Sequence, residues 1–146
     1  MSENPVITAV TDIPASPDRV WRELTDFAGY ASWHPALRFV DVPESVATGT
    51  RLRAEVRTGN GNDGEYEFTV LHFEESRLLV WEAGIPGVLV GRHSFAVEPH
   101  DGGTRFTDSE EFSGSAAVNA VEPGRARLEK DYAGYGEALK ARVGSG

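Results

Sequence analysis

The sequence contains no cysteine, and this absence excludes several kinds of chemistry. Without a thiol, the chain has no disulfide, no cysteine nucleophile and no thiolate ligand for a metal ion. Its histidines also lack the spacing that is typical of metal ligands; they are His34, His72, His93 and His100. The sequence therefore predicts neither a metal site nor any other cofactor.

Basic residues are also scarce, since 14 Lys and Arg stand against 23 Asp and Glu, for a formal net charge of −9. Nucleic acids and anionic membranes are recognised by clustered Lys and Arg, so we expect neither as a partner. Long apolar runs and a basic, apolar N-terminal signal pattern are missing too, which predicts a cytoplasmic protein. The length predicts one domain, residues 1–146.

One long amphipathic pattern, over residues 125–143, predicts a helix near the C-terminus. Its apolar side chains recur every three or four positions and so form one stripe: Leu128, Tyr132, Tyr135, Leu139 and Val143. A sheet with one apolar face must pack against another element, and only this helix is long enough to cover it. We therefore expect an α+β fold in which a sheet curves around the terminal helix.

The rest of the chain alternates between strand patterns and turn signals. A short helix is expected after Ser16-Pro17, because Ser16 can cap it and proline suits its first turn; Gly29 is expected to end it, and a further turn follows at 30–33. Seven strands are expected, at 6–13, 36–43, 50–58, 65–74, 77–83, 91–99 and 104–112, with an apolar loop at 85–90. Short hairpin connections predict an antiparallel sheet.

The middle strands leave two questions open. The inward face of strand 65–74 is undecided, because two sets of apolar residues compete for it: Tyr66, Phe68 and Val70 against Leu71 and Phe73. The second question is oligomeric state, since an apolar patch on one sheet face would suit a homodimer. The residues expected in that patch are Leu71, Phe73, Leu78 and Val80.

Several fragments, in order, resemble the START-like (SRPBCC) superfamily, also called polyketide cyclase/dehydrase-like. They include Ile13-Pro14-Ala15-Ser16-Pro17, Trp33-His34-Pro35 and Ser109-Glu110-Glu111-Phe112-Ser113-Gly114. The resemblance covers nearly the whole chain. It implies a helix-grip fold, which is a seven-stranded antiparallel sheet around the C-terminal helix with a deep apolar cavity between them. Members include aromatic polyketide cyclases, lipid and hormone binders and Hsp90 co-chaperone-like domains, so fold alone does not decide function.

One feature departs from that family pattern. Pro123-Gly124 interrupts the segment that leads into the last helix. Because proline removes a helical hydrogen bond and clashes with the preceding turn, residues 116–122 are predicted to form a separate turn or kinked segment. The family fold places this segment at the mouth of the cavity.

The last two strands predict a polar pair on the apolar face. A two-residue turn at Asp101-Gly102 sets their register, so that His93 opposes Glu110 and Phe95 opposes Asp108. Side chains that face each other across strands are within hydrogen-bonding reach, with Cβ atoms about 5 Å apart. We interpret His93, Glu110 and Asp108 as candidate catalytic acid–base groups; an ion pair at a solvent-exposed mouth is the structural alternative.

Aromatic and imidazole side chains are the candidate ligand contacts, because binding pockets are lined mostly by such groups. They are Trp33, His34, Tyr66, Trp81, Phe95, Tyr132 and Tyr135. The glycine-rich segment 59–64 matches G-x-G-x-x-G, but a strand follows where a nucleotide site needs a helix, so we interpret it as a hairpin loop.

These observations predict a protein that binds a small hydrophobic or aromatic molecule. The sharper hypothesis is cofactor-free cyclisation or dehydration by side-chain acid–base chemistry. A carrier without chemistry and a co-chaperone-like interaction domain are the alternatives, and the identity of the ligand is left open.

Overall fold

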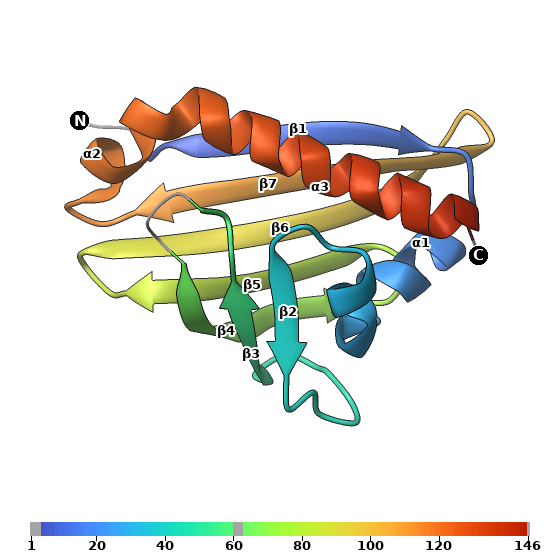
Figure 1. Ribbon diagram of the computed structural model, residues 1–146, viewed down its shortest axis with the longest axis horizontal. Coiled ribbons are helices and arrows are strands. Elements are labelled where there is room, and N and C mark those ends of the chain that lie inside the picture. Colours follow the sequence, from blue (N-terminus) through green and yellow to red (C-terminus); the bar gives the residue numbers. More distant parts are fainter. Residues whose placement is uncertain (1–3, 60–62, 146) are drawn as a thin grey trace.

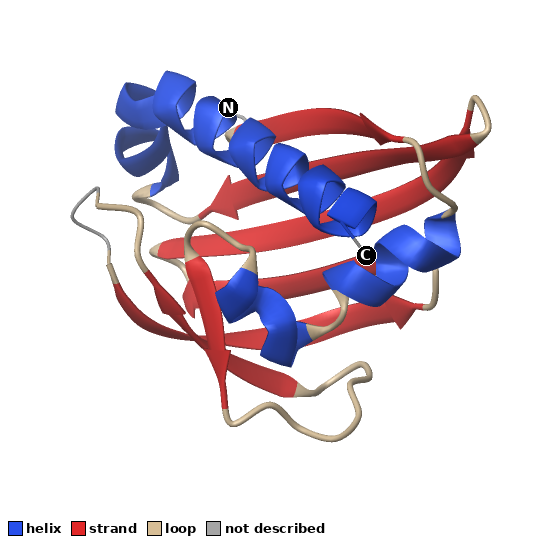
Figure 2. Ribbon diagram, turned by 45° about the vertical axis from the view of Figure 1, so that its right-hand side comes forward, coloured by secondary structure: helices blue, strands red, loops and turns tan. Residues whose placement is uncertain are grey.

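The computed structural model describes residues 4–59 and 63–145 and shows one curved sheet with a long helix lying across it (Figures 1 and 2). In chain order the elements are β1 (Val6–Ile13), α1 (Pro17–Leu24), the 3₁₀ helix η1 (Phe27–Ser32), β2 (Leu37–Val40), β3 (Arg51–Val56), β4 (Gly64–Glu74), β5 (Leu78–Ile85), β6 (Leu89–His100), β7 (Gly103–Ser113), α2 (Ala117–Val121), the 3₁₀ turn η2 (Glu122–Gly124) and α3 (Arg125–Ser145). The sheet has seven strands in the order β1-β7-β6-β5-β4-β3-β2, and each neighbouring pair is antiparallel. The predicted α+β helix-grip fold is confirmed.

Helix α3 buries the predicted stripe against the concave side of the sheet. Tyr132, Leu139 and Val143 are buried. Where α3 crosses β1, the contact is close enough to need a glycine, because a Cβ on Gly136 would lie 2.1 Å from Thr11 Oγ1. A larger residue at 136 would therefore push the helix away from the sheet.

The break before α3 is also as predicted. Helix α2 ends at Val121, η2 contains Pro123, and α3 begins at Arg125. Pro123 has no backbone N–H, so a continuous helix through this position would lack one hydrogen bond. The chain forms the 3₁₀ turn η2 here instead. The short helix α2 consequently stands apart from α3 at one end of the molecule (Figure 1).

The undecided face of strand 65–74 is settled by a β-bulge between Val70 and His72. A bulge adds one residue to one strand and so shifts the alternation of its side chains. Val70, before the bulge, is buried, and Phe73, after it, makes an edge-on contact with Trp21 at a centroid distance of 5.4 Å. Both apolar sets thus contribute to the inner face, and Phe73 does not belong to the predicted outer patch.

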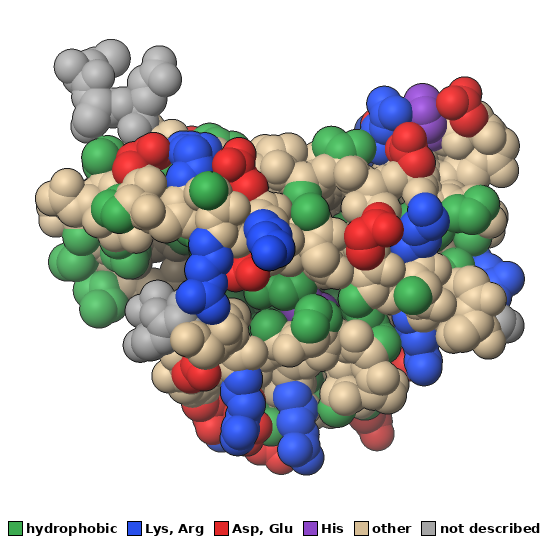
Figure 3. Space-filling view, turned by 45° about the horizontal axis from the view of Figure 1, so that its top comes forward, with side chains coloured by type: hydrophobic (Ala, Val, Ile, Leu, Met, Phe, Trp, Pro, Cys, Tyr) green, Lys and Arg blue, Asp and Glu red, His purple; other side chains and the backbone are tan. Residues whose placement is uncertain are grey.

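The other members of that predicted patch, Leu71, Leu78 and Val80, are half-buried. The strongly exposed large apolar side chains lie elsewhere: Val6, Val10, Tyr66, Ile85, Val88 and Val118. Ile85 and Val88, at the β5–β6 turn, and Val118, on α2, lie at one end of the molecule. That end has a hydrophobic surface (Figure 3).

Three of the expected boundaries that differ from the structure have a clear local reason. Helix α1 ends at Leu24 rather than Gly29: the Thr25 N–H still bonds to the Trp21 carbonyl at 2.9 Å, but the Asp26 N–H bonds to the Glu23 carbonyl and leaves the helical pattern. Strand β2 ends at Val40, since Asp41 adopts φ 50°. The apolar loop expected at 85–90 is shorter, because Ile85 and Leu89 pair across the β5–β6 turn.

The turn expected at 30–33 begins earlier in the chain and is the 3₁₀ helix η1. In the glycine-rich segment 59–64, residues 60–62 lie outside the described residues, and Gly64 begins strand β4. Among the residues that the structure describes, no helix is both long and apolar enough to cross a membrane.

Candidate functional site

The register of β6 and β7 is the predicted one, with His93 opposite Glu110 and Phe95 opposite Asp108. The connecting turn at Asp101 and Gly102 has φ angles of 47° and 79°. These are the left-handed values that a tight hairpin turn requires at both central positions. The turn therefore determines which polar side chains of the two strands share the concave face.

Four side chains form a continuous group on this face, joined by two hydrogen bonds and one ion pair, which we call the polar chain: Asp108, His93, Glu110 and Tyr132. His93 Nε2 is hydrogen-bonded to Asp108 Oδ1. His93 Nδ1 lies 3.4 Å from Glu110 Oε1, which also accepts a hydrogen bond from the Tyr132 hydroxyl of α3. The carboxylate nearer to His93 is thus the diagonal Asp108 and not the facing Glu110.

The polar chain is shielded from water. The exposed fractions of its side chains are 2% for Asp108, 13% for His93 and 16% for Glu110. The imidazole of His93 stacks on Phe95 and on Tyr132, with centroid distances of 4.2 Å and 5.2 Å. An ion pair at a solvent-exposed mouth does not describe this arrangement.

Burial and charge act in opposite directions on His93. Burial lowers the pKa of the imidazole, but the charges of Asp108 and Glu110 and the hydrogen bond to Asp108 raise it more, so the net pKa lies above 6.5. Burial, followed by the charge and hydrogen bond of Glu110, raises the pKa of Tyr132 well above 10. These shifts favour the imidazolium form of His93 and the neutral phenol of Tyr132, and each of these forms can donate a hydrogen bond to a neighbouring carboxylate.

Gly91 makes room for the polar chain, and sequence reasoning missed it. It lies on β6 opposite Phe112, and a Cβ at this position would lie 2.1 Å from Glu110 Oε2. The available signal was a glycine inside a strand pattern, which often marks a close approach of another group. A side chain at 91 would displace the Glu110 carboxylate.

Beside the polar chain lies a small cavity of about 20 Å³. Five of the predicted site residues line it, namely Trp33, His34, Phe95, Asp108 and Tyr135. The remaining lining residues were not predicted, because they come from separate elements that only folding brings together: Leu24, Tyr30, Leu37, Phe106 and Leu139. A cavity of this volume holds about one water molecule. Buried aromatic side chains occupy much of the space where the family resemblance implied a deep cavity.

The other predicted contacts have different positions. Trp81 is 2% exposed and packs edge-on against Phe95 at 4.8 Å, so it supports the site from the core. Tyr132 belongs to the polar chain. Tyr66 is 39% exposed and does not line the cavity, because it stands on β4 while α3 covers β1 and β7 (Figure 1).

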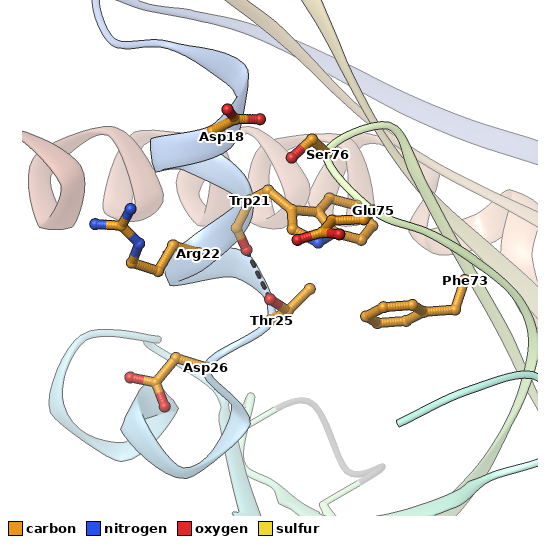
Figure 4. Close-up of a pocket in the computed structure, with 8 residues that line it drawn as sticks. All are labelled: Asp18, Trp21, Arg22, Thr25, Asp26, Phe73, Glu75 and Ser76. Carbon is orange, nitrogen blue, oxygen red and sulfur yellow. Dashed lines mark hydrogen bonds between the residues drawn. The ribbon is translucent and has the colours of Figure 1, made fainter. Parts of the chain in front are cut away.

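A larger hollow, of about 770 Å³, lies on the outside between α1 and the β4–β5 turn (Figure 4). Its lining combines Trp21 and Phe73 with charged and hydroxyl side chains: Asp18, Arg22, Thr25, Asp26, Glu75 and Ser76. None of the polar chain reaches it. Over residues 4–59 and 63–145, no three His, Asp or Glu side chains are arranged to hold a metal ion. The buried polar chain and its cavity are therefore the candidate site.

Comparison with solved structures shows that this fold is shared. The di-domain ARO/CYC StfQ from the steffimycin biosynthetic pathway has a TM-score of 0.77 and 14% identity, over 96% of this chain and 50% of that chain. Ara h 8.0201 has a TM-score of 0.75 and 13% identity, over 99% and 100% of the two chains. TTHA0849 from Thermus thermophilus has a TM-score of 0.74 and 16% identity, over 97% and 98%. At such identities the likeness shows the fold alone.

A search of curated proteins found no match. The family model described as polyketide cyclase / dehydrase and lipid transport matches residues 5–144. This match spans nearly the whole chain, in agreement with the helix-grip architecture. The chain therefore belongs to the polyketide cyclase/dehydrase and lipid transport family.

Proposed function

We propose that this protein binds a small hydrophobic or aromatic molecule at the concave face and catalyses a cofactor-free cyclisation or dehydration. The observation that carries the proposal is the polar chain itself. A buried histidine between two carboxylates, packed against aromatic rings, is the kind of perturbed titratable group that clusters at functional sites. Asp108 links this group to the cavity, because it lines the cavity and is hydrogen-bonded to His93.

The arrangement suits proton transfer at a ketone. In a cyclisation, a base removes a proton from the carbon beside one carbonyl, and an acid protonates the oxygen of the carbonyl that is attacked. The Asp108 carboxylate is the base, and the His93 imidazolium supplies the proton. A proton then returns from Asp108 to His93, so the pair regains its starting state.

Dehydration uses the same two groups. Asp108 takes the proton beside the carbonyl, the bond between carbon and the hydroxyl oxygen breaks, and the proton from His93 lets the hydroxyl leave as water. Glu110 and the phenol of Tyr132 hold the second ring nitrogen of His93 in place. Glu110 thereby keeps the imidazole charged and oriented.

The test is turnover by two variants, after aromatic and polyketide-like β-keto compounds have been screened for binding by thermal shift. His93→Gln and Glu110→Gln are expected to lower kcat by about 10²- to 10⁴-fold, which is the usual contribution of positioned acid–base groups. Ligand affinity should change little. His72→Gln and Glu111→Gln are the matched controls, because both residues are exposed on the same sheet. Normal turnover by both site variants would refute the catalytic proposal.

A carrier function is the second candidate, and one observation favours it. Both ring nitrogens of His93 already face carboxylates of the protein, so the polar chain is satisfied without a ligand. If ligands bind but none is converted, carriage is the better description. The burial of both acids gives no support to a co-chaperone-like interaction surface.

A further inference from the structure

The indole of Trp33 carries a polar group without a partner. Its Nε1 atom is buried, and it makes no hydrogen bond among the residues that the structure describes. The ring is packed between Tyr30 and His34, with centroid distances of 4.8 Å and 5.3 Å. Buried N–H groups in folded proteins almost always have an acceptor, so an unpaired one needs an explanation. A missing acceptor from outside the protein is such an explanation.

His34 presents a second donor beside it. Its Nδ1 accepts the backbone N–H groups of Ala36 and Leu37, each at 3.0 Å. A neutral ring that accepts at Nδ1 must carry its proton on Nε2. Burial, then the charge of His93, lowers the pKa of His34 to about 3, so the ring is neutral throughout the physiological range. In the described part of the chain, His34 Nε2 makes no hydrogen bond, so it is free to donate one to a ligand.

Both side chains line the same small cavity as Asp108. Its volume of about 20 Å³ fits a single oxygen atom with its hydrogens, and no more. Two neutral donors suit an oxygen that only accepts hydrogen bonds, as a carbonyl oxygen does. A ligand carboxylate would instead meet the negative charges of Asp108 and Glu110.

The cavity also lies beside a groove on the surface. An outer groove of about 350 Å³ shares His34 and Leu37 with the cavity as common walls. This volume lies within the range of about 300–1,000 Å³ that is usual for small-molecule sites. A change of the Leu37 rotamer would join the two spaces and leave His34 in the orientation that the hydrogen bonds at its Nδ1 fix, with the body of a ligand in the groove and its oxygen in the cavity.

We propose that Trp33 and His34 donate hydrogen bonds to one carbonyl oxygen of the ligand, and that the ligand is an aryl ketone. The inference rests on the proposed function, because it places the reacting ketone within reach of Asp108. It assigns Trp33 and His34 to binding and polarising the oxygen, and it leaves proton transfer to the polar chain.

The test compares two ligands of nearly equal shape, 2-acetylnaphthalene and 2-isopropenylnaphthalene, which differ in carrying C=O or C=CH₂. By calorimetry, the wild type is expected to bind the ketone about two- to tenfold more tightly, the usual contribution of a neutral hydrogen bond. Trp33→Phe should remove much of this preference and leave the affinity for the hydrocarbon unchanged. Trp21→Phe is the matched control, because Trp21 lines the outer hollow and not the cavity.

An NMR measurement on the wild type does not depend on any variant folding. The indole N–H signal of Trp33 should move downfield with the ketone and stay in place with the hydrocarbon, while the signals of Trp21 and Trp81 serve as internal references. Equal binding of both compounds, or an unmoved Trp33 signal at saturation, would overturn the inference and leave ligand binding intact. Absence of binding by either compound, and by every compound of the β-keto screen, would overturn the proposed function together with it.

Discussion

Replacement of Asp108 by asparagine is the sharpest test of the polar chain, because it removes one buried charge with little change of shape. The side chains of Asp108 and His93 are 2% and 13% exposed, so solvent screens their interaction only weakly. Loss of one partner from a buried ion pair typically costs about 3–5 kcal/mol of the free energy of unfolding. His93 can release its proton and Glu110 remains 3.4 Å away, so we expect Asp108→Asn to cost about 3 kcal/mol, the lower end.

The loss should depend on pH in a definite direction. The pKa of folded His93 is raised above 6.5, so the stability that this shift contributes is fully present below pH 6.5. This contribution to stability disappears as the pH rises through the raised pKa of His93 in the folded protein. Above that pKa, His93 is neutral in both the folded and the unfolded protein. Asp108→Asn should therefore cost more free energy near pH 6 than near pH 10.

Urea unfolding followed by tryptophan fluorescence, at several pH values between about 6 and 10, measures this difference. An NMR titration of the His93 ring in the two proteins checks the cause, since the variant should show a lower pKa. Asp12→Asn is the control, because Asp12 pairs with Arg105 at the surface and its loss should have a much smaller effect. An equal loss at both ends of the pH range, with an unchanged pKa of His93, would refute this account of the site.

Two further predictions concern glycines. Gly91→Ala should displace the Glu110 carboxylate, which would lie 2.1 Å from the new methyl group, and so reduce turnover as Glu110→Gln does; retention of full activity would show that Glu110 has no required position. Gly136→Ala should destabilise the protein by about 1–3 kcal/mol in urea unfolding, because the methyl group would overlap Thr11 on β1. Its control is Gly134→Ala on the same helix, where the Cβ meets nothing within 4 Å and a gain of about 0.5–1 kcal/mol is expected. Equal effects of the two helix substitutions would contradict the close packing of α3 on β1.

Local signals in the sequence were sufficient for the framework of this protein. The stripe from Leu128 to Val143 predicts α3, because apolar side chains at helical spacing must share one face. Asp101 and Gly102 predict the β6–β7 turn and hence the register that places His93 opposite Glu110. Pro123 predicts the break before α3 for an equally local reason, since it cannot continue a helix.

The connections within the site depend on tertiary structure. Tyr132 reaches Glu110 only because α3 packs across β7, and no spacing along the chain encodes that contact. His93 bonds to the diagonal Asp108 and not to the facing Glu110, whose carboxylate occupies the room that Gly91 leaves, and neither contact can be read from the strand register alone. The bulge in β4 lets Val70 of one apolar set and Phe73 of the other both pack inward, and aromatic side chains from separate elements reduce the space beside Asp108 to about 20 Å³. These features arise from packing between distant segments, whereas the turns, the helix and the register arise from residues that are neighbours in the chain.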